Sequence, residues 1–218
     1  MSSDDLKRQA ALAALEEIRD GMIVGLGSGS TASIFIRELG KKGLKIAAIP
    51  TSDESRRIAE EVGIPLTTFE AHPQINVTVD GADEVSPALD LTKGLGGALV
   101  REKIVAHASQ RLVIIVDESK LVERLGTKAP IPVEVIPLAV PRVLLQLQGA
   151  RVREKSGQPF VSDNGNLILD WKRAGIENPG ALEKELKAMT GVVDSGIFAG
   201  VANVVIVAGS NGIRKLSR

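Results

Sequence analysis

The sequence predicts an α/β protein: an open parallel sheet with helices on both faces, together with a smaller inserted α+β domain. Over roughly the first 120 residues, short apolar runs alternate with stretches of helical periodicity, which is typical of parallel sheets covered by helices. Four prolines within twelve residues then interrupt the alternation: Pro130, Pro132, Pro137 and Pro141. A fully apolar run at 201–207 returns to the pattern of the first half. A smaller domain is therefore expected to interrupt the sheet domain.

The first half of the chain contains the expected elements of the parallel sheet. The first helix begins at Ser2–Asp5, where a serine can cap it and acidic residues favour its positive end, and it stops by Asp20-Gly21. Further helices are expected at 31–39, 53–61 and 97–109. Short apolar runs predict buried strands at 22–26, 46–49, 77–79 and 112–116. Strands and helices thus alternate in chain order.

The region after Gly126 departs from this order. Residues 132–140 are rich in Val, Ile and Leu but lie between prolines, which predicts an edge strand. The expected elements after it are a helix at 142–148, an extended stretch at 151–161, a strand at 167–170 and a helix at 179–189. We therefore divide the chain into a sheet domain of residues 1–126 and 198–218 and a small α+β domain of residues 127–197.

The composition excludes several kinds of chemistry. The 218 residues include no cysteine and no tyrosine, and the two histidines are His72 and His107. Disulfides, thiol nucleophiles and cysteine or multi-histidine metal sites are therefore excluded within one chain. Lys plus Arg and Asp plus Glu each number 27, so the net charge of zero argues against nucleic acid or an anionic membrane as the main partner. Carboxylates, lysines, hydroxyls and backbone amides must carry the chemistry.

The sequence gives no sign of a membrane or of export. No apolar run reaches the roughly 18–20 residues of a membrane span, and the N-terminal residues lack the pattern of a signal peptide. Four Phe and one Trp are too few to build stacking platforms for nucleic acid bases. We therefore expect a cytoplasmic protein.

A glycine-rich segment follows the first predicted strand and opens a helix: Gly25-Leu26-Gly27-Ser28-Gly29-Ser30-Thr31-Ala32. Glycines let a backbone approach a ligand closely, and the free amides at a helix start bind anions together with Ser and Thr hydroxyls. Phosphate is the expected anion. A dinucleotide-binding fingerprint would need a third glycine where Ser30 stands, and a Walker loop would need a Gly-Lys-Ser/Thr. An ordinary strand–helix turn is the alternative interpretation.

Carboxylates cluster directly after the strand that ends at Val79, in the run Asp80-Gly81-Ala82-Asp83-Glu84. The carboxyl ends of parallel strands line the ligand crevice of open sheets. Carboxylates gathered there repel one another, and a raised pKa on one of them would supply a general acid or base. A helix cap with solvated carboxylates and a Mg²⁺ site are the alternatives.

Two lysines follow strands in the same way. Lys93 precedes Gly94-Leu95-Gly96-Gly97, where a lysine beside a mobile backbone could stabilise a developing oxyanion. The helix after this loop carries Glu102, which could reach the same crevice as a proton-transfer base. Lys120 follows the strand at 112–116 and could bind a phosphate or a carboxylate. The alternatives are a solvated helix face for Glu102 and a surface loop for Lys120.

Loops after four predicted strands thus carry a phosphate cradle, a carboxylate cluster and two lysines, and all would meet at one edge of the sheet. Another such loop, at 51–55, is either a helix cap or a hydroxyl-rich wall of the crevice. The set favours a small phosphorylated sugar or polyol beside a carboxylate base. Proton transfer through an enediol needs only a carboxylate and an electrostatic stabiliser, whereas the shortage of histidines disfavours a metal-assisted hydride shift.

Together these motifs closely resemble the ribose-5-phosphate isomerase A family. The resemblance rests on GLGSGSTA (25–32), TSDES (51–55), DGADEV (80–85), KGLGGALVREK (93–103) and DESK (117–120), and also on PVEVIP (132–137), SDNGNLILD (162–170) and GVVDSGIFAG (191–200). It runs in the same order from about Lys7 to Ser210, and the combined DGADE and KGxGGAxxREK motifs are highly specific. The resemblance implies a Rossmann-like sheet domain and a ferredoxin-like second domain.

The resemblance also implies an activity. It is the reversible conversion of D-ribose 5-phosphate to D-ribulose 5-phosphate in the non-oxidative pentose phosphate pathway, without metal or cofactor. Glu102 would be the proton acceptor that works between carbons 1 and 2 of the open-chain sugar. Asp80 and Asp83 would assist ring opening and proton traffic at the sugar oxygens, and Lys93 would stabilise the enediolate.

Substrate binding is implied for a wider set of residues: Lys7, Ser28, Gly29, Ser30, Thr31, Asp80, Gly81, Ala82, Asp83, Lys93, Gly94, Leu95, Gly96 and Lys120. The implied partner is the small phosphorylated sugar, and the family's habits imply a homo-oligomer, either a dimer or a tetramer. Leu95 departs from the family pattern, because many relatives have a third small residue there. We expect this leucine to affect loop mobility and kinetics and to leave the reaction unchanged.

Three other functions remain as alternatives. A phosphosugar-binding regulator of similar fold usually carries an attached DNA-binding segment, and the twenty or so residues before the first strand leave no room for one. A nicotinamide-dependent dehydrogenase is weakened by Ser30 and by the lack of an acidic residue at the end of the second strand. A Schiff-base aldolase that uses Lys93 or Lys120 would form an adduct that borohydride traps.

Overall fold

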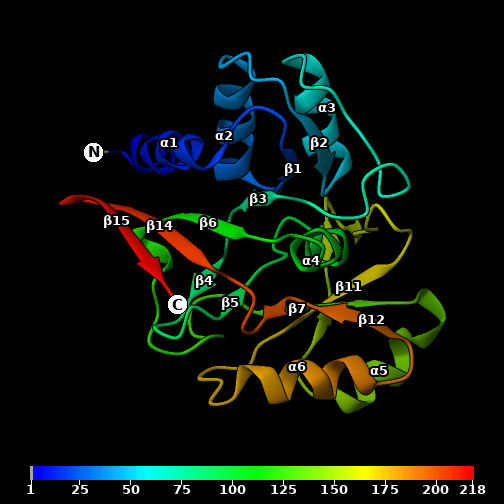
Figure 1. The fold of residues 1–218 in the computed structure, drawn as a ribbon. Coiled ribbons are helices and arrows are strands. Elements are labelled where there is room, and N and C mark those ends of the chain that lie inside the picture. Colours follow the sequence, from blue (N-terminus) through cyan, green and yellow to red (C-terminus); the bar gives the residue numbers. More distant parts are fainter. Residues whose placement is uncertain (1) are drawn as a thin grey trace. The chain divides into compact units, whose positions relative to one another are not determined.

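The computed structural model describes residues 2–218, which form two units (Figure 1). The first unit comprises the chain up to Ala82 together with Arg101–Leu121 and Val201–Arg218. The second unit comprises Asp83–Val100 and Val122–Gly200. These bounds differ from the expected small domain at 127–197, chiefly because the second unit also takes in residues 83–100.

Strand pairing explains why residues 83–100 belong to the second unit. Strands β4 (Glu84–Val85) and β5 (Leu91–Thr92) form a three-stranded sheet with β13 (Ile197–Phe198), in the order β13-β5-β4. All the pairs in this sheet are antiparallel. Each strand has only two residues, which is too short for a hydrophobic pattern to predict it from the sequence.

A six-stranded sheet forms the centre of the first unit, in the order β15-β14-β6-β3-β1-β2. Its strands are β1 (Ile23–Leu26), β2 (Ala47–Pro50), β3 (Val77–Asp80), β6 (Leu112–Asp117), β14 (Val204–Gly209) and β15 (Gly212–Ser217). Neighbouring strands are parallel from β2 to β14, and β15 is antiparallel at the edge. The predicted parallel sheet is confirmed, and the apolar run at 201–207 rejoins it as β14.

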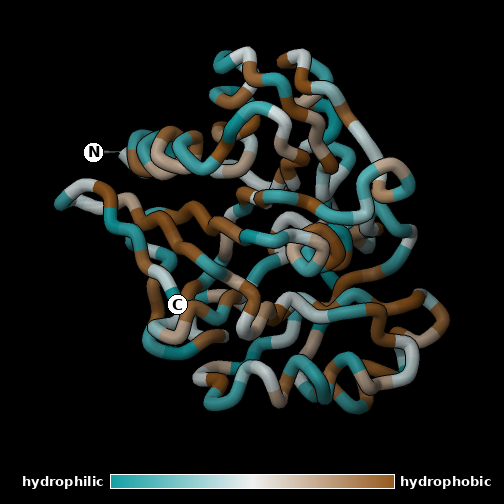
Figure 2. The backbone as a smooth tube through the Cα atoms, in the orientation of Figure 1, coloured by the Kyte–Doolittle hydropathy of each residue, from teal (hydrophilic) through white to brown (hydrophobic). Residues whose placement is uncertain are grey.

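Helices cover both faces of this sheet. Residues of α1 (Ser3–Ala14), α2 (Ser30–Gly40) and α3 (Asp53–Glu61) pack into one core with Ala48 and alternate residues of the other strands. On α4 (Leu99–His107), Val105 packs with Ile49 and Ile75. Because Ala48 and Ile49 are consecutive residues of a strand, they point to opposite faces. Strands covered on both faces are continuously apolar, as the brown colour of β14 shows (Figure 2).

The second unit contains a four-stranded antiparallel sheet in the order β12-β7-β11-β8. Its elements follow one another as β7 (Ile131–Val135), α5 (Val140–Gln146), β8 (Arg151–Val152), β11 (Leu167–Trp171), α6 (Pro179–Ala188) and β12 (Val192–Ser195). A small hairpin of β9 (Glu154–Lys155) and β10 (Gln158–Pro159) lies between β8 and β11 in the chain. This βαββαβ order, with the last strand beside the first, is the ferredoxin-like arrangement that was expected.

The prediction of an edge strand at 132–140 is wrong. Strand β7 ends at Val135 and lies between β12 and β11, and the residues after it form the short helix η3 (Pro137–Ala139) and the start of α5. An internal strand tolerates Pro132 because the pairing with β12 ends at Val133 and Ser195. Beyond that pair, Pro132 contributes only its carbonyl, which accepts a hydrogen bond from the N–H of Gly196 at 2.7 Å. The N–H that proline lacks is therefore not needed for pairing.

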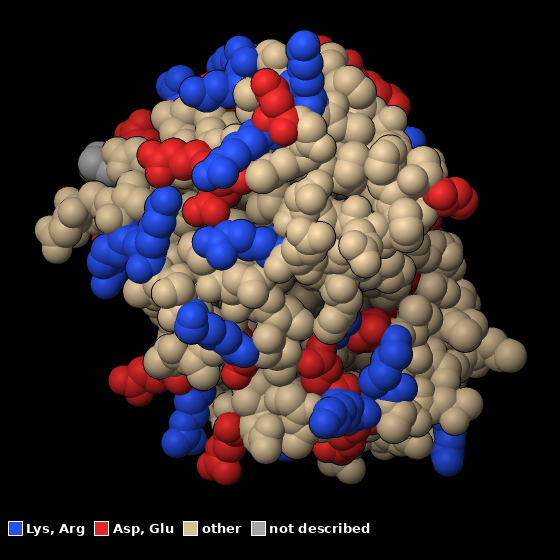
Figure 3. Space-filling model, viewed as in Figure 1, with Lys and Arg blue, Asp and Glu red and all other residues tan. Residues whose placement is uncertain are grey.

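The surface of the described chain carries charges of both signs. Figure 3 shows acidic and basic side chains interspersed on the face in view, in keeping with a net charge of zero. Among residues 2–218, no helix combines the length and apolarity that a membrane crossing needs.

Candidate functional site

Asp80 ends strand β3 and is joined to the glycine-rich loop that follows β1. Its Oδ1 accepts hydrogen bonds from the backbone N–H of Ser28 at 3.0 Å and of Gly81 at 2.7 Å. Gly27 permits this approach, because a Cβ at that position would lie 2.2 Å from Asp80 Oδ1. The buried carboxylate is thereby fixed at the carboxyl end of the parallel sheet, where open α/β sheets bind their ligands.

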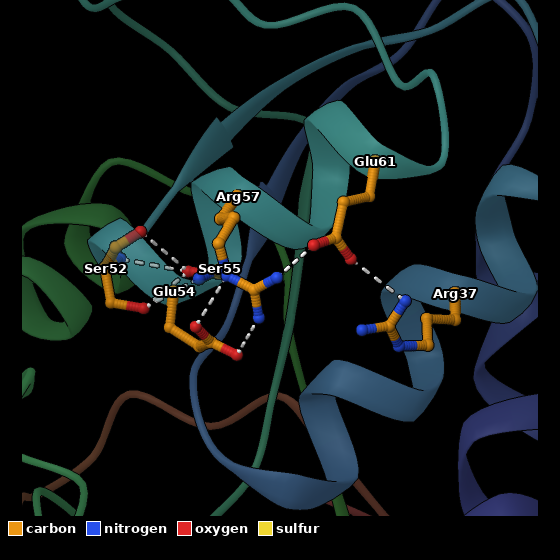
Figure 4. Close-up of polar contacts among 6 residues, drawn as sticks. All are labelled: Arg37, Ser52, Glu54, Ser55, Arg57 and Glu61. Atoms are coloured by element: carbon orange, nitrogen blue, oxygen red, sulfur yellow. Dashed lines mark hydrogen bonds and ion pairs between the residues drawn. The ribbon is translucent and has the colours of Figure 1, made fainter.

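The side chain of Ser28 belongs to a chain of hydroxyls. Ser28 Oγ lies 2.7 Å from Thr51 Oγ1 and donates to Ser52 Oγ at 2.8 Å. Thr51 Oγ1 in turn donates to the carbonyl of Leu26 at 2.9 Å. Ser52 also caps α3 through a capping box with Ser55 (Figure 4). Residues 51–55 therefore form the predicted helix cap, and the hydroxyls of Thr51 and Ser52 also bind that of Ser28.

Helix α2 begins at Ser30, directly after Gly29. The φ of Gly29 is +95°, a conformation that favours glycine and turns the chain from the loop into the helix. Since Gly29 brings no side chain to the cap position, the backbone N–H groups of the first turn are left to water or to an anion. The hydroxyls of Ser30 and Thr31 belong to the same turn. A strand–loop–helix turn of this kind can bind an anion.

Two lysines of the first unit belong to other elements. Lys7 lies on α1, with its Nζ 3.4 Å from Oδ1 of the exposed Asp4. Lys120 ends the short helix η2 (Glu118–Lys120), directly after β6. Asp117 caps that helix by accepting the N–H of Ser119 at 2.9 Å. Both cations thus belong to the unit that contains the glycine-rich loop.

Glu102 lies in the first turn of α4 and is 4% exposed. The neighbouring Arg101 pairs with Asp53 at the start of α3, at 2.7 Å. One turn further along, Val105 packs so closely on Gly25 of β1 that a Cβ there would lie 2.7 Å from its Cγ1. These contacts fasten the helix to the sheet. A nearly buried carboxylate in such a fixed place is a candidate proton-transfer base.

Lys93 follows β5 in the second unit and is 2% exposed. Its Nζ lies 5.6 Å from the centroid of the Phe198 ring, which is within the range of a cation–π contact. Its backbone N–H donates to the carbonyl of Gly196 at 2.8 Å, and a Cβ on Gly196 would lie 2.2 Å from the Lys93 carbonyl oxygen. Phe198 and Gly196 therefore position Lys93. Both residues belong to the motif GVVDSGIFAG (191–200), and no local sequence signal marks them as partners of Lys93.

The loop after Lys93 turns sharply at two glycines. Gly94 has a φ of +100° and Gly97 a φ of +87°, and a Cβ on Gly97 would lie 2.4 Å from the Phe160 ring. Leu95, which is 44% exposed, does not have a positive φ. Its backbone N–H donates to Asp83 Oδ2 at 3.0 Å. Leu95 thus occupies a position that does not require glycine.

Glu84, the third carboxylate of the cluster, has a structural role in the second unit. It is fully buried, and its oxygens accept backbone N–H groups from Gly126 at 2.6 Å, Lys128 at 2.5 Å and Ala129 at 3.1 Å. The hydroxyl of Thr92 donates to it at 3.2 Å. Four donors around one carboxylate fix the segment 126–129.

The predicted site residues fall into two sets. The first unit contains Lys7, Ser28, Gly29, Ser30, Thr31, Asp80, Gly81, Ala82, Glu102 and Lys120. The second unit contains Asp83, Lys93, Gly94, Leu95 and Gly96. The chain itself joins the two sets, since Asp83 follows Ala82 directly and Glu102 lies nine residues after Lys93.

Comparisons with known proteins agree with the motifs. The family model of ribose 5-phosphate isomerase A (phosphoriboisomerase A) matches residues 47–212. The ribose-5-phosphate isomerase A of Methanothermobacter thermautotrophicus is 49% identical over 222 residues, which cover 97% of each chain. That of Bradyrhizobium diazoefficiens is 45% identical over 236 residues, which cover 100% of this chain and 98% of the relative.

Solved structures agree as well. One is a D-ribose-5-phosphate isomerase in complex with phospho-erythronic acid, which is 41% identical and has a TM-score of 0.98 over 100% of both chains. Another is the ribose 5-phosphate isomerase A of Methanocaldococcus jannaschii, also 41% identical, with a TM-score of 0.95 over 100% of both chains. By its sequence motifs, its fold and these full-length similarities, the chain belongs to the ribose 5-phosphate isomerase A family.

Proposed function

We propose that this chain interconverts D-ribose 5-phosphate and D-ribulose 5-phosphate, and that Glu102 moves the proton between carbons 1 and 2 of the open-chain sugar. The family and its aldose–ketose isomerisation support the reaction. The observation that carries the residue assignment is the burial of Glu102 on a helix that is fixed to α3 at Asp53 and to strand β1 at Gly25. A general base must be fixed within hydrogen-bond reach of its proton, and this helix is fixed.

Removing the proton from carbon 2 leaves an enediolate whose negative charge must be stabilised. We assign that task to Lys93, whose position is set by Gly196 and Phe198. The proton then returns from Glu102 to carbon 1, while the hydroxyl proton on the oxygen of carbon 2 passes to the oxygen of carbon 1. Together these transfers convert the aldose to the ketose without an external oxidant. Phospho-erythronic acid, found in the solved relative, joins a phosphate to a carboxylate beside a hydroxyl-bearing carbon, which is the charge pattern of such an enediolate.

Asp80 and Asp83 act on the sugar oxygens in this proposal. Ring opening requires a proton to leave one oxygen and reach another, which carboxylates can relay. Asp80 is suited to this because two backbone N–H groups fix the orientation of its carboxylate. Asp83 in addition binds Leu95 N–H and so links the sugar site to the glycine loop.

The phosphate group is assigned to the start of α2. Ser30 and Thr31 supply hydroxyls, the first turn supplies backbone N–H groups, and the wall of Ser28, Thr51 and Ser52 shapes the loop. Lys7 and Lys120 would neutralise the charge of the dianion. The backbone would approach the substrate at five further positions: Gly81, Ala82, Gly94, Leu95 and Gly96.

The first unit is then the catalytic domain, and the second unit is the small domain, to which Lys93 and Asp83 belong. A homo-oligomer in the cytoplasm, a dimer or a tetramer, is part of the same proposal. The resemblance to the family implies this assembly, and sedimentation velocity measures it directly.

The experiment that tests the function is turnover of D-ribose 5-phosphate by purified protein in EDTA and deuterated water. We expect fast conversion to D-ribulose 5-phosphate with deuterium in the product, because the base exchanges its proton with solvent. Conversion without exchange would point to a shielded transfer or a hydride shift. Folded protein without turnover would contradict the proposal and favour the phosphosugar-binding alternative. Borohydride with substrate should trap no adduct.

A further inference from the structure

Arg153, in the second unit, binds the backbone of the loop that follows Lys93. Its Nη1 donates to the carbonyl of Gly94 at 2.8 Å and to that of Leu95 at 2.9 Å. These are the first two carbonyls after Lys93. A guanidinium that binds two successive carbonyls restricts the rotation of the peptide between them. Arg153 therefore limits the freedom that Gly94 would otherwise give this loop.

Arg153 is itself fixed from two sides. Its Nε donates to Asp170 Oδ2 at 2.9 Å and its Nη2 donates to Asp170 Oδ1, so the pair is bidentate. The guanidinium also lies 6.0 Å from the centroid of the Phe160 ring. The same ring fills the space beside Gly97, at the other end of the loop. With its side chain 11% exposed, Arg153 is more buried than an ordinary surface arginine.

The loop is therefore held at three backbone groups. Arg153 binds the carbonyls of Gly94 and Leu95, and Asp83 binds the N–H of Leu95. Just before the loop, the N–H of Lys93 is bound to Gly196. An ammonium that stabilises a developing charge must be in place before the reaction, and a displacement of about 1 Å can cost roughly 10²-fold in rate.

We propose that Arg153, supported by Asp170, is a positioning residue of the isomerisation, and that it fixes the glycine loop so that Lys93 meets the enediolate. The proposal rests on the role proposed above for Lys93. Arg153 acts through the backbone of the loop and does not itself contact the substrate. Its loss should therefore lower kcat and leave the binding of the phosphorylated sugar largely unchanged.

The test compares Arg153→Gln and Arg153→Lys with a matched control, Arg173→Gln. Arg173 also lies over an aromatic ring of the second unit, 5.0 Å from the Trp171 centroid, but it is an exposed residue. We expect kcat to fall about 10- to 100-fold in Arg153→Gln, with KM changed less than about threefold. Arg153→Lys should recover little, because an ammonium lacks the planar fork and has three donors, too few for the four bonds that Arg153 makes to Asp170 and the two carbonyls. Arg173→Gln should keep normal kinetics.

A double-mutant cycle separates this role from a general structural one. If Arg153 acts through Lys93, adding Arg153→Gln to Lys93→Met should lower the residual kcat by less than about threefold. The same factor in both backgrounds would overturn the proposal, and so would a normal kcat in Arg153→Gln. Should Arg153→Gln fail to fold by circular dichroism, Asp170→Asn takes its place with the same expectations. Inactive wild-type protein would refute the proposed function, whereas active wild type with active Arg153 variants would refute only this inference.

Discussion

Glu102 carries the proposed proton transfer, and its burial on a fixed helix makes it the most sensitive single position. Glu102→Gln keeps the shape of the side chain and removes its basicity. We expect kcat to fall about 10²- to 10⁴-fold, with KM for D-ribose 5-phosphate little changed. The exposed Glu60 on α3 offers the control Glu60→Gln, which should behave as wild type. Near-normal turnover by Glu102→Gln would remove Glu102 from the role of base.

Lys120 tests the phosphate side of the site. Lys120→Ala removes one charge-assisted contact to the phosphate, so KM should rise roughly tenfold or more while kcat is largely kept. The comparison is Lys172→Ala, which removes an exposed lysine of the second unit. Steady-state kinetics measure both constants. An unchanged KM in Lys120→Ala would show that the phosphate lies elsewhere.

At the scale of elements, the loop after Lys93 contains two kinds of glycine. Gly97 is required by the backbone conformation, whereas Gly96 is not. A methyl group on Gly97 meets the Phe160 ring at 2.4 Å in a left-handed conformation, so Gly97→Ala should destabilise the fold by at least about 2 kcal/mol and lower kcat. Around Gly96 the described chain leaves open space for a Cβ, so Gly96→Ala should fold normally. Urea unfolding compares the two variants. Equal stability would show that the loop adjusts to Gly97→Ala freely.

A surface ion-pair network joins Glu54, Arg57 and Glu61 of helix α3 to Arg37 of helix α2 (Figure 4). Hydrogen bonding and charge from Arg57 lower the pKa of Glu54 below its usual 4.5, and Glu54 raises the pKa of Arg57. A lowered carboxyl pKa contributes stability above the unfolded-state pKa, and this stability is lost as the pH falls through the folded-state pKa. These side chains are exposed, so the effect is small and screened by salt.

We therefore expect Arg57→Gln to lower Tm slightly at neutral pH and low salt. The deficit should vanish near about pH 3 and in about 1 M salt, where the carboxylates are protonated or screened. Thermal melts at the three conditions measure it. A deficit that persists at low pH would show that the aliphatic part of Arg57 matters more than its charge.

At the scale of the whole molecule, the chain passes between its two units several times. It enters the second unit again at Val122, and Glu84 of that unit fixes the entering chain by binding segment 126–129. Glu84→Gln places an amide NH₂ among backbone donors, which should cost about 2 kcal/mol and lower Tm by roughly 4–8 °C. Trp171, the single tryptophan, lies on β11, so its fluorescence reports on the second unit. The exposed Glu123 gives the control Glu123→Gln. An unchanged tryptophan transition would contradict a structural role for Glu84.

Most of the first unit could be predicted from the sequence because its signals are local. Ser2 and Ser52 cap helices by contacts within three residues, and strands such as β6 are continuous apolar runs. The glycines of the loop at 25–29 mark close backbone approaches and a positive φ at Gly29, which few other residues satisfy. The ferredoxin-like order of the second unit was expected from motifs, whereas the placement of β7 inside its sheet was not.

The sequence by itself determined the fold class, the family motifs and the candidate chemistry, because caps, apolar periodicity and glycine turns act over a few residues. Only the tertiary structure decided what the remaining polar side chains do. Glu84 belongs to the same motif as Asp80, yet it binds Gly126, 42 residues away. Arg153 reaches Gly94 across 59 residues, and no local pattern marks it. A polar side chain takes its role from the donors and acceptors that folding brings beside it, and those partners are distant in the chain.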